Sequence, residues 1–127
     1  MKDPELELLI SQLEDRKDLS VADFDAVIHA LTFLLPEKMS HIVATPQHIC
    51  TTDGALIVAD EAYPNWAVHI HGRANDKDGQ WRCFLRESEV RDNDAVIGSG
   101  RSAVLAQAIL AAVLRLSMHL SKQPASS

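Results

Sequence analysis

A dense hydrophobic pattern between residues 103 and 120 predicts a long C-terminal helix, with Ser102 as its N-cap. Apolar residues recur every three or four positions and form one row: Leu105, Ile109, Val113, Leu116 and Leu120. The polar residues Gln107, Arg115 and His119 follow a single stripe. A second apolar row lies beside the first and consists of Leu110, Leu114 and Met118. Either the rest of the chain wraps this helix, or a second copy covers the second row.

Two shorter patterns predict a pair of N-terminal helices. The first begins at Asp3-Pro4-Glu5, where Asp suits the cap and Pro the first turn. The second opens at Ser20 and ends near Pro36. The short connection indicates that the two helices pack antiparallel or nearly so. Their apolar faces are Leu6, Leu9, Ile10 and Leu13 in the first, and Phe24, Val27, Ile28, Leu31 and Leu35 in the second.

Alternating polar and apolar residues predict an antiparallel hairpin between residues 66 and 86, with a turn around Asp78-Gly79. A third short strand is expected at 95–97, before a pair of glycines. Residues 37–60 stay open, because the run at 53–59 suits a short helix or a strand. The predicted fold is α+β: an N-terminal helical pair, a small antiparallel sheet of about three strands, and a long C-terminal helix packed against the sheet.

Length and charge narrow the function classes. The chain has 127 residues, which suits a single domain over 1–121 with a disordered tail at 122–127. The net charge of −6 disfavours nucleic acid and anionic membranes as partners. Cys50 and Cys83 match no metal spacing and are expected to be buried free thiols. The acidic residues in the first stretch argue against an export signal, so we expect a cytoplasmic protein.

The segment just before the C-terminal helix is a candidate anion site. It combines two glycines, two hydroxyls and an arginine, and free backbone N–H groups at a helix N-terminus attract anions. It lacks the third glycine of a dinucleotide fingerprint and is not a P-loop. The alternative is a plain strand-to-helix turn that needs glycine flexibility. The candidate residues are Gly98, Ser99, Gly100, Arg101 and Ser102.

His69 and His71 are a candidate metal pair. They lie two positions apart on a predicted strand, so they point to the same face about 7 Å apart. His-x-His is a spacing that metal ligands use, and His41 or His48 could supply a third ligand. The alternative is two solvent-facing histidines opposite the arginines of the neighbouring strand. No cofactor is expected.

Three stretches carry a resemblance to small proteins of bacteriophages and alphaproteobacteria, of the phage ABA-sandwich type. They are LLISQLEDRKDLSVADFDAVIHAL, TTDGALIVADEAYPNWAVHI and SAVLAQAILAAVLRL. The chain departs from that pattern at His48-Ile49-Cys50, where such proteins usually have an aromatic followed by Thr or Ser. It also departs at Arg101-Ser102, where they tend to have Thr-Pro. The resemblance implies a helix–sheet–helix sandwich with a helix at 53–60, and it implies no catalytic residues.

The sequence contains no recognisable catalytic constellation, so we favour a non-catalytic interaction or accessory domain over an enzyme. The wide apolar surface of the last helix predicts self-association as a homodimer through Leu110, Leu114 and Met118. The alternative is a small-molecule or anion-binding enzyme that uses Gly98–Ser102 with the His69 and His71 face or with Arg82. An RNA-binding module is the least favoured, because only Arg101 offers a positive charge near the start of the last helix.

Overall fold

The computed structural model describes residues 3–42, 44–72, 80–86 and 97–121. The helices and strands confirm the α+β class, with helices before and after a three-stranded antiparallel sheet. In chain order they are α1 (Asp3–Asp15), the 3-10 turn η1 (Val21–Asp23), α2 (Phe24–Leu34), α3 (Pro36–Met39), α4 (Pro46–Ile49), α5 (Thr52–Ala62), β1 (Ala67–His71), β2 (Trp81–Arg86), β3 (Ile97–Ser102) and α6 (Leu105–Ser121).

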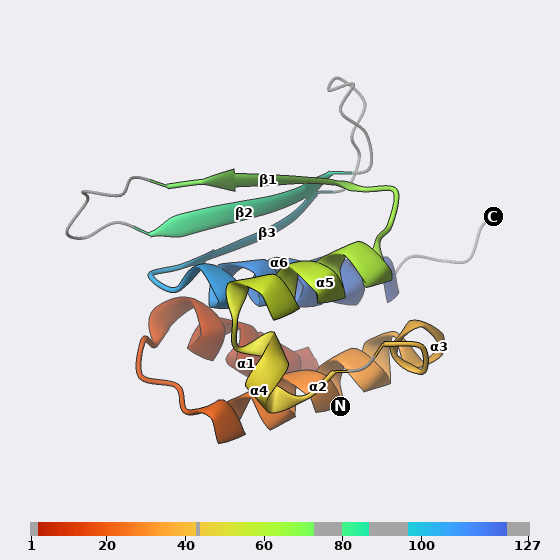
Figure 1. Cartoon of the computed structure of the whole chain (residues 1–127), viewed down its shortest axis with the longest axis horizontal. Helices are drawn as coiled ribbons and strands as arrows, with labels where there is room; N and C mark the ends of the chain where they lie inside the picture. Colours follow the sequence, from red (N-terminus) through yellow and green to blue (C-terminus); the bar gives the residue numbers. More distant parts are fainter. Residues whose placement is uncertain (1–2, 43, 73–79, 87–96, 122–127) are drawn as a thin grey trace.

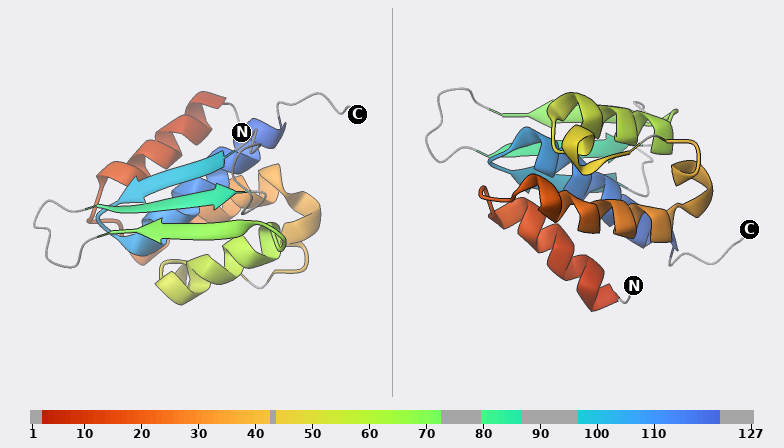
Figure 2. Two further views of the ribbon diagram at one scale, coloured as in Figure 1. Left: turned by 90° about the horizontal axis from the view of Figure 1, so that it is seen from above. Right: turned by 60° about the horizontal axis from the view of Figure 1, so that its bottom comes forward.

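The described elements form three layers (Figure 1). The sheet is the first layer, α5 and α6 are the second, and α1 to α4 are the third. The described helices therefore lie on one side of the sheet. Seen from above the sheet, β3 lies on the side of α1 and β1 on the side of α5 (Figure 2).

Neighbouring strands of the sheet are antiparallel, in the order β1-β2-β3. Successive side chains of a strand point to opposite faces. The residues turned toward α6 include Cys83 and Leu85, which are fully buried. The opposite face of the sheet carries no described helix, and His71, Arg82 and Arg101 are exposed there.

Helix α6 is the centre of the hydrophobic core. Twelve of its 17 residues are buried, and it contacts β2, β3, α1, α2 and α5. Leu110 and Leu114 have no exposed surface, and Met118 is 7% exposed. The chain therefore covers the second apolar row with its own helices. The predicted dimer contact through Leu110, Leu114 and Met118 is wrong, because these side chains are buried within one copy.

The glycine pair before α6 lies inside β3 and not in a turn. A Cβ added to Gly100 would lie 2.6 Å from the backbone nitrogen of Ala112 and closer still to the carbonyl oxygen of Ala108. The absence of side chains at Gly98 and Gly100 thus lets α6 pack directly on β3. The helix begins at Leu105, and the Ser102 hydroxyl accepts a hydrogen bond of 3.1 Å from the backbone N–H of Val104. The predicted strand-to-helix turn at 98–102 is therefore wrong, because these residues belong to β3 and α6 packs directly on them.

Residues 37–60, for which the sequence did not decide between helix and strand, contain helical segments. Residues 36–39 and 46–49 form two single-turn helices, and 52–62 form α5. The hydroxyl of Thr51 caps α5 by accepting a hydrogen bond of 3.0 Å from the backbone N–H of Gly54. The predicted turn at Asp78-Gly79, most of the strand predicted at 95–97 and the predicted disordered tail at 122–127 lie outside the described residues.

Candidate functional site

The sheet face turned away from the helices is positively charged. The three strands contain Arg82, Arg86 and Arg101 with His69 and His71, and they contain no Asp or Glu. The chain as a whole carries a net charge of −6. The three described strands therefore differ in charge from the chain as a whole.

The register of the strands places two arginines directly opposite each other. Arg82 of β2 pairs with Arg101 of β3, and His71 of β1 pairs with Arg82 on its other side. Like charges opposite each other on neighbouring strands destabilise a sheet. The register thus brings two arginines and a histidine to neighbouring positions on the open face of the sheet.

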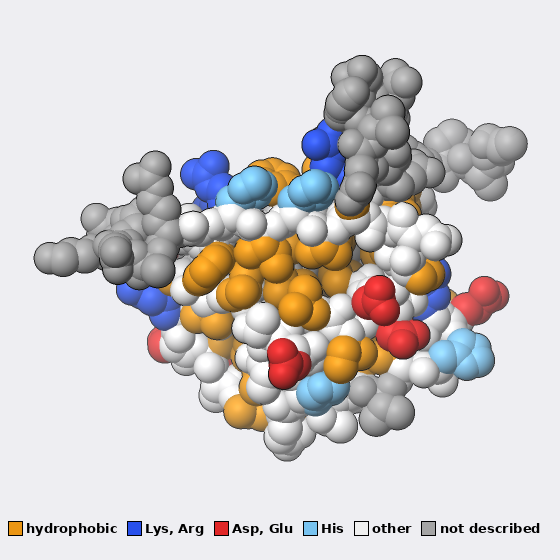
Figure 3. Space-filling model, turned by 45° about the horizontal axis from the view of Figure 1, so that its top comes forward, with side chains coloured by type: hydrophobic (Ala, Val, Ile, Leu, Met, Phe, Trp, Pro, Cys, Tyr) orange, Lys and Arg blue, Asp and Glu red, His pale blue; other side chains and the backbone are white. Residues whose placement is uncertain are grey.

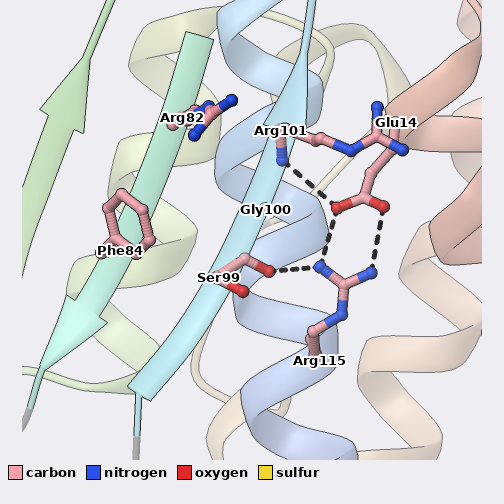
Figure 4. A pocket seen from close by; sticks show the side chains of 7 residues that line it. All are labelled: Glu14, Arg82, Phe84, Ser99, Gly100, Arg101 and Arg115. Atoms are coloured by element: carbon pink, nitrogen blue, oxygen red, sulfur yellow. Dashed lines mark hydrogen bonds and ion pairs between the residues drawn. The ribbon is translucent and has the colours of Figure 1, made fainter.

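A cavity of about 340 Å³ opens beside this row (Figure 4). Arg82 and Phe84 reach it from β2, Ser99, Gly100 and Arg101 from β3, Glu14 from α1 and Arg115 from α6. We call it the arginine pocket. Three of its seven lining residues are arginines and one is a glutamate, so the pocket is net positive.

Glu14 and Arg115 form the inner wall of the arginine pocket. The Arg115 guanidinium donates to both carboxylate oxygens of Glu14, at 2.7 and 3.0 Å, and to the Ser99 carbonyl oxygen at 2.6 Å. The backbone N–H of Arg101 also donates to Glu14, at 3.2 Å. Burial alone raises the pKa of Glu14, but these hydrogen bonds and the two positive charges outweigh it and hold that pKa below its ordinary value.

The two opposed arginines are held differently. The Arg101 side chain is turned toward α1, away from Arg82 (Figure 4), and its guanidinium lies 3.3 Å from both Asp15 Oδ1 and Gln80 Oε1. Both contacts are exposed, so they contribute little stability. Arg82 is exposed and makes no hydrogen bond or ion pair with a described residue. No side chain in the described part of the chain therefore holds its guanidinium.

A second cavity, of about 420 Å³, lies on the same face and is lined by His69, His71, Phe84, Arg86 and Ile97. We call it the histidine pocket. Phe84 belongs to both pockets and separates them. The ring of His71 meets that of Phe84 edge-on, with 5.7 Å between centroids. Nε2 of His69 is buried and has no hydrogen-bond partner among the described residues, which is uncommon in folded proteins.

The structure separates the five residues predicted as an anion site. Ser99, Gly100 and Arg101 line the arginine pocket, whereas Gly98 and Ser102 are buried against the helical layer. Because the segment is a strand, its backbone does not form a helix N-terminus. An anion would instead meet the side chains of Arg82 and Arg101. The sequence indicated Arg82 as a candidate beside the two histidines, and the alternation of β2 placed Phe84 on the same face. It did not select Phe84, Glu14 or Arg115 as site residues.

The described residues place no third metal ligand beside His69 and His71. Within the described residues, no group of three or more His, Cys, Asp or Glu side chains is placed to hold a metal ion. Both histidines lie on the open face and line the histidine pocket instead. His41 and His48 follow or belong to the short helices of the third layer, away from the sheet.

Comparisons with protein-family models, with curated proteins and with solved structures found no match. The site is therefore interpreted from its own chemistry. Among the helices that the structure describes, none is long and apolar enough to cross a membrane.

Proposed function

We propose that the chain is a small non-catalytic binding domain that holds an anionic ligand on the open face of its sheet. One observation carries this proposal: the three strands contain three arginines, two histidines and no acidic residue, in a chain of net charge −6. Such local concentration of one sign of charge attracts and orients ligands of the opposite sign. Arginine is suited to carboxylate and phosphate because its planar guanidinium donates two parallel hydrogen bonds.

The state of Glu14 favours binding over catalysis. A general base needs a free carboxylate with a pKa near the working pH. Both oxygens of Glu14 are engaged by Arg115, and its pKa is lowered. The carboxylate therefore positions Arg115 and shapes the pocket wall, and it is poorly suited to take a proton from a substrate.

Isothermal titration calorimetry with inorganic tripolyphosphate tests the proposal. The buffer should be reducing, because we propose a cytoplasmic setting. Arg82→Gln should weaken binding at least ten-fold, and raised salt should weaken it further. Lys38→Gln, which removes a positive charge from α3 in the third layer, is the matched control and should bind as the wild type does. Equal affinity of Arg82→Gln and wild type, or no binding at low salt, would reject the proposal.

Self-association remains a second candidate, through a different surface from the one expected. β1 is an edge strand without Lys or Pro, and such strands can pair with another copy. Val68 on β1 and Ile57 on α5 are 38% and 45% exposed. Figure 3 shows hydrophobic side chains gathered on the side of the molecule that carries β1 and α5. Light scattering should then give a dimer for the wild type and a monomer for Val68→Lys; a monomeric wild type at high concentration would exclude this candidate.

A further inference from the structure

The charge and shape of the open face also indicate the class of its ligand. We infer that the sheet binds nucleotide units, with a phosphate between Arg82 and Arg101 and a planar base against Phe84. This inference rests on the proposed function, because it names the anion that the arginine pocket takes. The net charge of the whole chain led us to disfavour nucleic acid as a partner. The present inference differs because it considers the charge of the sheet alone.

The phosphate half of the inference follows from the opposed arginines. Arg82 and Arg101 occupy paired positions on β2 and β3, with the Arg101 side chain turned toward α1 in the free protein. A phosphate held between them would make charge-assisted hydrogen bonds with both guanidinium groups. Arg101 can turn to such a ligand because its contacts with Asp15 and Gln80 are exposed and 3.3 Å long. Arg115 stays with Glu14 and does not take part.

The base half of the inference follows from Phe84. This ring is partly buried and lines both the arginine pocket and the histidine pocket. It lies two residues from Arg82 along β2, a step of about 7 Å that a phosphate ester carrying a ring can bridge. Aromatic side chains beside a positive groove are how many proteins hold unpaired bases, since every base offers a flat face for stacking. A plain carboxylate or an acidic peptide of glutamates has no flat ring to stack on Phe84, so this side chain would add little to its binding.

The two pockets flank Phe84 and measure about 340 and 420 Å³, in the range of sites for small ligands. A free mononucleotide would occupy one of them. A single strand would place successive nucleotides in both. The chemistry of recognition is the same in the two cases, so the experiment must distinguish the sources.

Calorimetry with four ligands tests the inference: tripolyphosphate, ribose 5-phosphate, adenosine 5′-monophosphate and a hexa-adenylate RNA strand. The monophosphate should bind at least 5-fold more tightly than ribose 5-phosphate, since stacking adds to the phosphate contact. Phe84→Leu should abolish that difference, whereas tripolyphosphate should still bind through the arginines. Arg82→Gln should weaken all four ligands at least ten-fold, and Lys38→Gln none. If the hexanucleotide binds at least ten-fold more tightly than the monophosphate, the ligand is a single strand. If the difference is smaller, the ligand is a free nucleotide.

The outcomes separate this inference from the proposed function. If tripolyphosphate binds through Arg82 but the monophosphate and ribose 5-phosphate bind equally, the anion site stands and the nucleotide inference is overturned. Tighter binding of a hexa-glutamate peptide than of the hexanucleotide would overturn it as well. If no anion binds, both proposals fail. Circular dichroism and thermal unfolding of Phe84→Leu verify that the variant is folded, and Phe84→Tyr, which keeps the ring, should retain the preference for the base.

Discussion

The carboxylate of Glu14 and the guanidinium of Arg115 join the first helix to the last through hydrogen bonds of 2.7 and 3.0 Å. The Glu14 side chain is 8% exposed, whereas that of Arg115 is 42% exposed. The same Arg115 guanidinium donates to the backbone of β3 at Ser99. One ion pair thus fixes α1, β3 and α6 relative to one another and forms the wall of the candidate site.

Glu14→Gln should destabilise the fold and reduce its sensitivity to acid. We expect a loss of about 1–3 kcal/mol at pH 7, less than the roughly 3–5 kcal/mol for breaking a fully buried pair, because Arg115 is partly solvated. The lowered pKa of Glu14 means that the folded state holds this proton less tightly than the unfolded state. Its stabilisation is therefore present above the ordinary carboxyl pKa of 4.5 and is lost as the pH falls through the folded pKa.

Urea unfolding at pH 7 and at a series of acidic values measures both effects. Glu7→Gln, on an exposed position of the same helix, is the control and should follow the wild type. If Glu14→Gln lost stability with acid as steeply as the wild type does, the assigned role of this carboxylate would be incorrect.

Gln107→Leu should detach the end of α1. The Gln107 side-chain amide is buried and donates to the carbonyl oxygens of Leu13 at 2.8 Å and Arg16 at 2.6 Å. Without this donor, the carbonyl oxygens of Leu13 and Arg16 lose a hydrogen-bond partner, which costs about 1–3 kcal/mol. Gln107→Glu should cost more, since it adds a carboxylate facing two carbonyls. Chemical denaturation ranks the three proteins, and equal midpoints would contradict the prediction.

Gly100→Ala should be among the most damaging single-methyl changes. The added Cβ would meet the backbone of α6 at Ala108 and Ala112, which cannot move aside as a flexible side chain can. We expect a loss of about 3 kcal/mol, the upper end for overpacked cores, or failure to fold. Ser99→Ala, next to it on the opposite face of β3, should change stability little. Thermal unfolding of both variants provides the measurement; similar melting temperatures would show that α6 can move away from β3.

Leu114→Ala should create a cavity and leave the oligomeric state unchanged. Leu114 is fully buried in one copy of the chain, so truncation costs about 2–5 kcal/mol. A residue at a dimer contact would instead change the molar mass. Light scattering on the folded variant, alongside its unfolding free energy, distinguishes the two effects. A change in molar mass without loss of stability would restore the earlier dimer hypothesis.

The two cysteines should differ sharply in reactivity. Burial raises the pKa of the Cys83 thiol to about 11, and its side chain is inaccessible in the core. Cys50 is partly exposed. A disulfide reagent at pH 8 should therefore modify one thiol quickly and the second only upon unfolding. Cys50→Ser should remove the fast phase, and Cys83→Ala the slow one; rapid modification of Cys83 in the native protein would contradict its burial.

The periodicity of the sequence predicted α1, α2, α6 and the two strands of the hairpin. Leu6, Leu9, Ile10 and Leu13 are all buried, as the first amphipathic pattern requires. The hydrophobic face of α6 was also identified, but periodicity does not distinguish burial by the same chain from burial by a second copy. That ambiguity produced the incorrect dimer contact.

The glycines of β3 were misread for a physical reason. Gly-Ser-Gly is typical of turns, and here the same residues form a strand because a helix backbone lies directly on it. Close packing of this kind is a tertiary effect with no local pattern. The arginine pocket was hidden for a similar reason, since Glu14 and Arg115 are 101 residues apart and Arg82 meets Arg101 only through strand register.

The central place of α6 has a consequence for how the chain is made. A ribosome releases α1 first and α6 last among the described helices, yet α1, α2, α5, β2 and β3 all pack on α6. Until residue 105 and those after it emerge, the apolar faces of the earlier helices have no common partner. Assembly of the core therefore waits until α6 has been synthesised, and the nascent chain leaves those apolar faces uncovered until then.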